Sequence, residues 1–242
     1  MRVRMLVAVA GLVGLSTALM GATPAGAGPS GDEETFCEAV VDISVLFNRV
    51  EEEPTPKQQR KIDRLLGQIE ENTPSELAQP VSVAAEAVRT GNFDDPAVQE
   101  AISTIDTWVA DNCGYEVVDV TATEYQFEGI PEALEAGTTL FRFTNEGAEL
   151  HDIGIARIKG DESIEEILAL PEEEAQEKAP LVAFGFATQG QTSIVYTKLT
   201  KAGTYGAACF VPVGATSPET AETAEGPPHF MEGMTAEFEV TK

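Results

Sequence analysis

The hydrophobic residues of this 242-residue chain follow a helical period in the first half and an alternating period in the second, and the change falls at Gly114. Between Asp32 and Gly114 apolar residues recur every three or four positions, which predicts amphipathic helices. The four apolar stripes are Phe36, Val40, Ile43, Phe47 and Val50; Ile62, Leu65, Leu66 and Ile69; Leu77, Val81, Ala84 and Val88; and Val98, Ile102, Ile105 and Val109 with Trp108. Four helices joined by short loops predict an up-down-up-down bundle.

Capping sequences mark the expected starts of three helices. Thr55-Pro56-Lys57-Gln58 and Thr73-Pro74-Ser75-Glu76 each combine an N-cap Thr, a Pro at the first helical position and Gln or Glu at the third, which is the pattern of a capping box. Asp95-Pro96 opens the last helix in the same way. Pro80 lies within the third stripe, where it either kinks the helix or delays its start.

From Gly114 onward apolar and polar residues alternate, as expected of strands with one buried face. The predicted strands cover residues 118–127, 137–143, 151–158, 192–199, 205–211 and 236–240. Short strands separated by Gly-containing turns predict an all-β sandwich or Greek-key barrel. An acidic insertion at residues 161–178 has Ile164, Ile167 and Leu168 at helical spacing and predicts one short surface helix. The fold class is therefore α+β, with a four-helix bundle at residues 28–114 and a β-sandwich at residues 115–242.

Residues 1–27 have the features of a secretory signal peptide. Arg2 and Arg4 precede an apolar run at residues 6–20, and Ala25-Gly26-Ala27 supplies the small residues of a cleavage site. The run is shorter than the roughly 20 residues that a membrane span needs. We expect the mature protein to be secreted or held in the cell envelope, with no membrane span after cleavage.

Cys37 lies near the start of the first predicted helix and Cys113 at the end of the fourth. In an up-down-up-down bundle these two ends share a pole, and an oxidising compartment favours a bond between them. A redox-active or metal-binding pair would need two cysteines that are close in sequence. We predict a structural disulfide, worth roughly 4 kcal/mol in the chain-entropy account.

The remaining cysteine, Cys209, lies in the second half together with both histidines of the chain, His151 and His229. Met231 and Met234 are the only methionines beyond the predicted signal peptide. An unpaired cysteine in a secreted protein indicates intermolecular pairing, burial or, with these neighbours, a bound metal. Two imidazoles, a thiolate and a thioether form the ligand set of a blue copper electron-transfer site.

Three segments of the second half resemble the cupredoxins, the blue copper family of plastocyanin and azurin. Phe141-Arg142-Phe143-Thr144-Asn145-Glu146-Gly147-Ala148-Glu149-Leu150-His151 is similar to the strand that ends in Asn-x-Gly before the first His ligand. Gly203-Thr204-Tyr205-Gly206-Ala207-Ala208-Cys209 is similar to the strand that delivers the thiolate. Pro228-His229-Phe230-Met231-Glu232-Gly233-Met234 matches the closing His-x4-Met. The segments occur in the family order, and the resemblance covers roughly residues 116–242.

The resemblance implies a Greek-key cupredoxin-like sandwich that binds one copper ion, as Cu(I) or Cu(II), through His151, Cys209, His229 and Met234. It implies that Met231 packs nearby and that an imidazole edge is the route for one-electron transfer. No enzymatic activity is expected, because copper oxidases and nitrite reductases need further His-rich centres and both histidines are already used. The alternatives are copper sequestration or delivery without redox chemistry, a binding module without metal, and nucleophilic catalysis by Cys209.

The spacing between Cys209 and His229 departs from the family pattern, because 19 residues separate ligands that usually lie a few residues apart. The excess falls at residues 214–225, a polar and acidic stretch that we expect to be a flexible loop. Doubling a loop costs only about 0.6 kcal/mol of closure entropy. The insertion therefore permits the site but is expected to loosen the placement of His229.

The charge of the chain limits its partners. Lys and Arg total 15 against 41 Asp and Glu, a formal net charge of -26. Nucleic acid and anionic lipid would be repelled, so the expected partner is a basic redox protein. Hydrophobic residues make up 43% of the chain, which supports a packed core, and acidic runs such as Glu172-Glu173-Glu174 are expected to be solvated faces.

Overall fold

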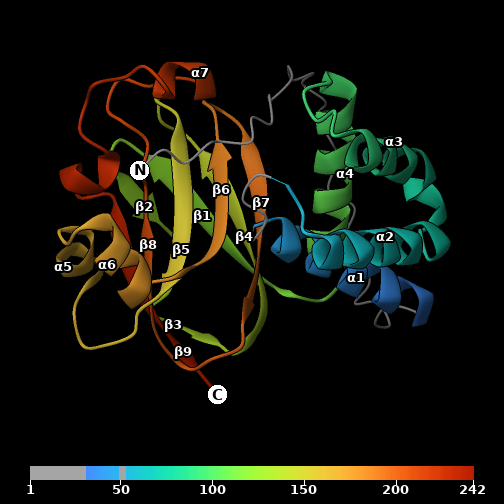
Figure 1. The fold of residues 1–242 in the computed structure, drawn as a ribbon, viewed down its shortest axis with the longest axis horizontal. Coiled ribbons are helices and arrows are strands. Elements are labelled where there is room, and N and C mark those ends of the chain that lie inside the picture. The colour runs from blue at the N-terminus through green and yellow to red at the C-terminus, as the bar shows by residue number, and fades with distance from the viewer. Residues whose placement is uncertain (1–30, 49–52) are drawn as a thin grey trace, which may run out of the picture. The chain divides into compact units, whose positions relative to one another are not determined.

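The computed structural model describes residues 31–48 and 53–242 (Figure 1). These residues include two compact units, one containing residues 54–114 and the other residues 115–242. We call them the helical unit and the β unit and describe each by itself. The predicted signal peptide at residues 1–27 and Val50 of the first predicted stripe lie outside the described residues.

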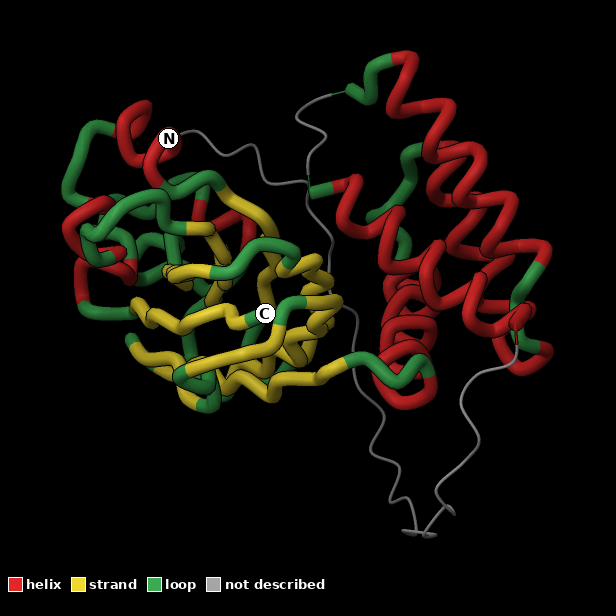
Figure 2. The backbone as a smooth tube through the Cα atoms, turned by 90° about the horizontal axis from the view of Figure 1, so that it is seen from below, coloured by secondary structure: helices red, strands yellow, loops and turns green. Residues whose placement is uncertain are grey.

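The first half folds into the four predicted helices (red in Figure 2). They are α1 (Gly31–Phe47), α2 (Pro56–Glu71), α3 (Ala78–Thr90) and α4 (Pro96–Asn112), and a 3-10 turn, η1 (Ser75–Leu77), precedes α3. The apolar face of α2 is buried as predicted, with Ile62, Leu65, Leu66 and Ile69 inside. The helical pattern of the sequence is therefore confirmed.

Two of the predicted helix starts are also confirmed. Oγ1 of Thr55 accepts a hydrogen bond from the N–H of Gln58 (3.3 Å), and Oε1 of Gln58 accepts one from the N–H of Thr55 (2.9 Å). The carboxylate of Asp95 accepts from the N–H of Ala97 (2.9 Å). Each cap supplies an acceptor to a backbone donor that the first helical turn leaves free.

The predicted capping box at residues 73–76 is wrong. The hydroxyl of Thr73 donates back to the carbonyl of Ile69 at the end of α2, and η1 begins after Pro74 without a side-chain cap. The Thr73 hydroxyl thus hydrogen-bonds to the end of α2 and does not cap the next helix. Pro80 falls in the first turn of α3, after η1, where its missing N–H costs nothing, so it delays the helix and does not kink it.

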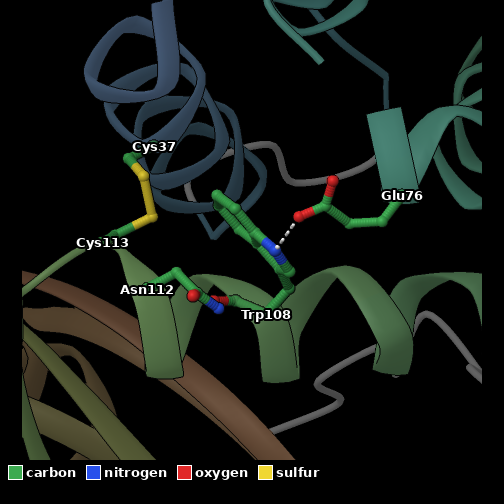
Figure 3. Close-up of a disulfide and its surroundings, with 5 residues drawn as sticks. All are labelled: Cys37, Glu76, Trp108, Asn112 and Cys113. Carbon is green, nitrogen blue, oxygen red and sulfur yellow. Dashed lines mark hydrogen bonds between the residues drawn. A yellow bond between two sulfur atoms is a disulfide. The ribbon is translucent and has the colours of Figure 1, made fainter. Parts of the chain in front are cut away.

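The predicted disulfide between Cys37 and Cys113 is present, with their Cα atoms 5.8 Å apart (Figure 3). It joins α1 to the residue that ends α4. Beside it the ring of Trp108 packs edge-on against Phe36, with centroids 5.6 Å apart. The indole N–H of Trp108 donates to Glu76 (3.1 Å; Figure 3). A covalent bond, an aromatic contact and a hydrogen bond therefore hold α1, η1 and α4 together.

The second half is a sandwich of two mixed sheets, ordered β2-β1-β4-β7 and β3-β9-β8-β5-β6 (Figure 1). The strands are β1 (Glu116–Thr123), β2 (Gln126–Glu128), β3 (Ala133–Glu135), β4 (Gly137–Asn145), β5 (His151–Arg157), β6 (Leu181–Ala187), β7 (Thr192–Leu199), β8 (Gly203–Ala208) and β9 (Thr235–Thr241). β1 runs parallel to β4 and β3 parallel to β9, while the other pairs are antiparallel. Both sheets contribute to one core, which includes Phe141, Phe143, Ile153, Ile155 and Phe238. Burying each such side chain contributes about 1.5–3 kcal/mol. The predicted α+β class and β-sandwich are confirmed.

The strand prediction is wrong at the start of the sandwich. Tyr125 and Phe127 do not continue β1; the chain reverses after Thr123, and β2 pairs antiparallel with β1, with Thr123 opposite Gln126. Both arms of this hairpin keep the alternating pattern, so the pattern alone does not reveal the turn. The sequence also did not predict β3, which is three residues long, or β6, whose apolar run lacks alternation.

The acidic insertion at residues 161–178 forms two helices instead of one, α5 (Ile164–Leu168) and α6 (Glu172–Lys178). Ile164 and Ile167 are buried, and the side chain of Ile164 lies so close to Gly206 of β8 that a Cβ there would stand 2.7 Å from it. The N–H of Ile164 also donates to Glu237 of β9 (2.5 Å). The insertion is thus packed onto β8 and β9.

The 214–225 segment, expected to be flexible, is folded. It contains α7 (Pro218–Ala221), and Ser217 is its N-cap. Ala215 is fully buried, and its carbonyl accepts a hydrogen bond from the N–H of Leu150 (2.7 Å). The expectation of a flexible loop is wrong because backbone groups of this segment find partners in the segment that leads to His151.

The stretches of chain that flank the 214–225 segment pair with each other. Pro212 and Pro228 form an antiparallel bridge, and the N–H of His229 donates to the carbonyl of Val211 (2.9 Å). The two flanking stretches therefore form a short antiparallel pair. This pairing returns His229 to the neighbourhood of Cys209 despite the length of chain between them.

Candidate metal centre

Three neighbouring strands carry the candidate ligands to one edge of a sheet. In the order β9-β8-β5, His151 is the first residue of β5, Cys209 follows the last residue of β8, and Met234 precedes the first residue of β9. Because these strands are antiparallel, the start of β5, the end of β8 and the start of β9 meet at the same edge. His229 begins a 3-10 turn, η2 (His229–Glu232), that leads into Met234.

The donor atoms of three of these residues converge. Nδ1 of His151 lies 3.1 Å from Nδ1 of His229, and Sγ of Cys209 lies 4.0 Å from the former and 3.4 Å from the latter. A triangle with these edges has a point about 2 Å from each corner, close to metal–nitrogen and metal–thiolate bond lengths. All three side chains are fully buried. The group therefore fits a single copper ion.

Comparison with known proteins gives structural matches only, since no family model and no curated protein matches the chain. Similar solved structures include auracyanin from Roseiflexus castenholzii (20% identity, 53% of this chain and 100% of that chain, TM-score 0.33). They also include auracyanin A, a blue copper protein of Chloroflexus aurantiacus (21% identity, 53% and 100%, TM-score 0.34), and a multicopper oxidase of Campylobacter jejuni (11% identity, 53% and 30%, TM-score 0.32). The β unit itself is a sandwich of two mixed sheets, and His, Cys and His meet at one edge of one of these sheets in the expected order. The β unit has a cupredoxin-like fold.

Both imidazoles of the cupredoxin-like unit are neutral at physiological pH. Burial, aided by the adjacent His229, lowers the pKa of His151 to about 4. Burial also lowers the pKa of His229, against the opposing effect of Glu149. Neutral imidazole is the form that binds metal, so the two histidines need not lose a proton first.

The thiol of Cys209 differs from the imidazoles in this respect. Burial, and secondarily the nearby Asp152, raises its pKa well above the usual value. The backbone N–H of Asp152 also points at the sulfur, 3.4 Å away. The thiol is therefore protonated without metal and must release its proton when a metal binds.

Backbone hydrogen bonds link the proposed ligand residues to one another. The N–H of Cys209 donates to the carbonyl of Met234 (3.1 Å), and the N–H of Met234 donates to the carbonyl of His229 (3.1 Å). Met234 is fully buried, whereas Met231 is 66% exposed. The expectation that Met231 packs beside the site is wrong, because the turn of η2 directs it outward. The role of Met234 as a ligand stays a prediction.

Neither imidazole has an exposed edge, and the expected electron route through an imidazole edge stays a prediction. The ring of His229 lies against that of Tyr125, with centroids 4.7 Å apart, and its Nε2 lies 3.0 Å from Glu149. Nε2 of His151 has no hydrogen-bond partner among the described residues and lies 3.8 Å from the carboxylate of Glu124. Other side chains therefore cover both rings.

Two polar residues around the site carry roles that the sequence analysis did not assign. The buried amide of Asn145 donates to the carbonyls of Glu149 (2.7 Å) and Ala187 (2.8 Å) and accepts from the N–H of Gly147 (2.8 Å). It shapes the turn that leads to His151, and the Asn-x-Gly motif was the available sign of this. Glu149 had no such sign, because it is one of 41 acidic residues.

Proposed function

We propose that this protein carries single electrons by means of one copper ion held by His151, Cys209, His229 and Met234. A copper ion held by these residues would supply one-electron redox chemistry between its Cu(II) and Cu(I) states. The observation that carries the proposal is the convergence of Nδ1, Nδ1 and Sγ within 4.0 Å of one another at a fully buried position.

The way in which the ligand residues are held supports electron transfer. Backbone hydrogen bonds connect Cys209 to Met234 and Met234 to His229, and the N–H of Phe230 donates to the carbonyl of Cys209 (2.9 Å). Donors fixed in this way keep one geometry when the charge of the bound ion changes. A fixed compromise between the preferences of the two copper oxidation states favours rapid electron transfer.

The ligand count supports a carrier over an enzyme. The chain has two histidines in all, and both belong to this group. Oxidation or reduction of a small molecule at copper requires an additional centre where substrate binds, and such centres are built largely from imidazoles. We therefore propose transfer between proteins and not turnover of a substrate.

We further propose that the protein works outside the cytoplasm as a secreted or envelope protein, with a signal peptide at residues 1–27 and domains at residues 28–114 and 115–242. The Cys37–Cys113 disulfide supports an oxidising compartment. No helix in the described part of the chain is long and apolar enough to cross a membrane. The net charge of -26 supports a basic redox partner, whose association should slow as ionic strength rises.

Adding Cu(II) to the purified mature protein tests this function. We expect an intense visible absorption from thiolate-to-copper charge transfer, abolished in Cys209→Ala, shifted in Met234→Leu and unchanged in the exposed control Met231→Leu. Absence of the band in the wild-type protein would refute electron transfer. Tight binding of colourless Cu(I) without the band would favour sequestration or delivery instead.

A further inference from the structure

We propose that Glu149 is the positioning residue of this centre, holding His229 in the tautomer and orientation that direct its Nδ1 at the metal. The inference rests on the proposed function, since it assigns a role within the same site. Because a long segment separates Cys209 from His229, a further contact is needed to fix the position of His229.

The carboxylate of Glu149 accepts hydrogen bonds from three separate parts of the cupredoxin-like unit. One donor is Nε2 of His229 (3.0 Å). A second is the backbone N–H of Gly214, within the long segment (2.6 Å). The third is the hydroxyl of Tyr125, whose ring lies against His229 (3.4 Å). A single side chain therefore ties the histidine to the segment that delivers it.

The backbone of Glu149 is fixed as well. Its N–H donates to the carboxylate of Glu124 (3.0 Å), and its carbonyl accepts from the amide of the buried Asn145 (2.7 Å). Asn145 in turn holds the turn before His151. The carboxylate that contacts His229 is thus anchored to the segment that carries the other histidine.

This hydrogen bond determines where the imidazole proton of His229 lies. A carboxylate can only accept, so Nε2 of His229 carries the proton. The lone pair is then left on Nδ1, which faces Sγ of Cys209 at 3.4 Å and Nδ1 of His151 at 3.1 Å. A histidine that binds metal with one nitrogen commonly donates to a carboxylate with the other, which fixes its ring and strengthens it as a ligand.

His151 lacks an equivalent contact, which makes the arrangement asymmetric. Its Nε2 has no hydrogen-bond partner in the described residues, and the carboxylate of Glu124 lies 3.8 Å away. The hydrogen bond to a carboxylate therefore restrains His229, which the long segment separates from Cys209, and not His151. Negative charge placed behind His229 also favours Cu(II) over Cu(I).

The test compares Glu149→Gln and Glu149→Ala with the control Glu146→Gln. Glu146 is exposed and lies three residues away in the same turn, so the control makes an equal change in net charge. We expect Glu149→Ala to weaken Cu(II) binding roughly 10- to 100-fold. Glu149→Gln should raise the reduction potential relative to wild type and to the control. Equal potentials and Cu(II) affinities for Glu149→Gln and Glu146→Gln would overturn the proposal.

A second measurement needs no copper. In the metal-free protein, nitrogen NMR of 15N-labelled histidine should show the His229 proton on Nε2 in wild type and a mixture of tautomers in Glu149→Ala. A proton on Nδ1 in wild type would overturn the proposal even if copper binds. If wild type binds no copper, the electron-transfer function fails, and the tautomer still decides whether Glu149 orients His229. Glu149→Gln and the wild-type spectrum carry the test if Glu149→Ala does not fold.

Discussion

The backbone N–H of Asp152 donates to Sγ of Cys209 at 3.4 Å, while Oδ1 of the same residue accepts from the N–H of Phe210 at 2.8 Å. Asp152 thus contacts Cys209 through its main chain and the residue after that cysteine, Phe210, through its side chain. The carboxyl group is buried, and burial raises the pKa of Asp152 to about 7. A carboxyl group beside the proposed thiolate ligand therefore titrates near neutral pH in the metal-free protein.

Asp152 should make the metal-free protein less stable as pH rises. In the unfolded chain this carboxyl ionises near pH 4, but in the folded protein it keeps its proton until about pH 7. Between these values the unfolded state binds fewer protons, so the free energy of unfolding falls with pH and levels off above the folded pKa. Asp152→Asn removes this contribution and should be more stable than wild type above pH 7, by up to about 4 kcal/mol.

Urea unfolding of wild type and Asp152→Asn between pH 4 and 8 measures this effect. The difference between the two proteins is the relevant quantity, because His151 and His229 titrate in both and cancel. A difference that stays constant across the range would contradict the buried, protonated state of Asp152.

Copper binding should release about one proton per ion at neutral pH. The imidazoles are already neutral, whereas the buried thiol of Cys209 is protonated because burial raises its pKa. Affinity for copper should therefore increase with pH. Calorimetry in two buffers of different ionisation enthalpy counts the released protons. Equal apparent enthalpies in both buffers would mean that Cys209 does not become a thiolate.

Gly147→Ala should weaken metal binding at least about tenfold, in the range seen when the support of a metal ligand is disturbed. A Cβ at Gly147 would lie 2.7 Å from Nε2 of the buried His151 and 2.5 Å from Oε1 of Glu124. The imidazole would have to shift to make room, and this shift would displace its Nδ1 from the position it holds beside Nδ1 of His229. Gly137→Ala is the matched control, because a Cβ there meets nothing within 4 Å. Comparable copper affinities for the two variants would show that His151 tolerates the displacement.

Removing the disulfide with the double substitution Cys37→Ala and Cys113→Ala should lower the free energy of unfolding by roughly 4 kcal/mol. The copper absorption should stay unchanged, because the proposed ligands all lie in the β unit. Denaturant unfolding followed by the fluorescence of Trp108, the single tryptophan, reports on the helices around the bond. Mass spectrometry that finds free thiols in the unreduced wild-type protein would contradict the bond itself.

The sequence predicted the parts of this fold that depend on local pattern and on rare residues. The stripe of α2 was found because its four apolar residues share one face. His151, Cys209 and His229 were found because the chain contains so few soft ligands that their positions stand out. Such patterns can be interpreted without knowledge of the tertiary contacts, and for this reason the predictions from them were correct.

The errors arise where a local pattern has two structural outcomes. Thr55 and Thr73 each precede a Pro and have Gln or Glu three residues later, yet only the hydroxyl of Thr55 caps the following helix. Composition suggested a flexible segment around Ala215, but hydrogen bonds to a distant part of the chain fold it. Glu149 was missed for the same reason, since only the assembled sandwich places it next to His229.

Because Pro212 and Pro228 form a bridge, the distance in space between Cys209 and His229 does not depend on how many residues lie between them. Residues added or deleted near the exposed Glu222 would change the length of the segment while the bridge keeps Cys209 and His229 in place. Evolution could therefore vary the exposed residues around Glu222 as a recognition element without retuning the centre, as long as Gly214 and Ala215 keep their contacts with Glu149 and Leu150. The same position is suited to inserting a short peptide for attaching the protein to an electrode.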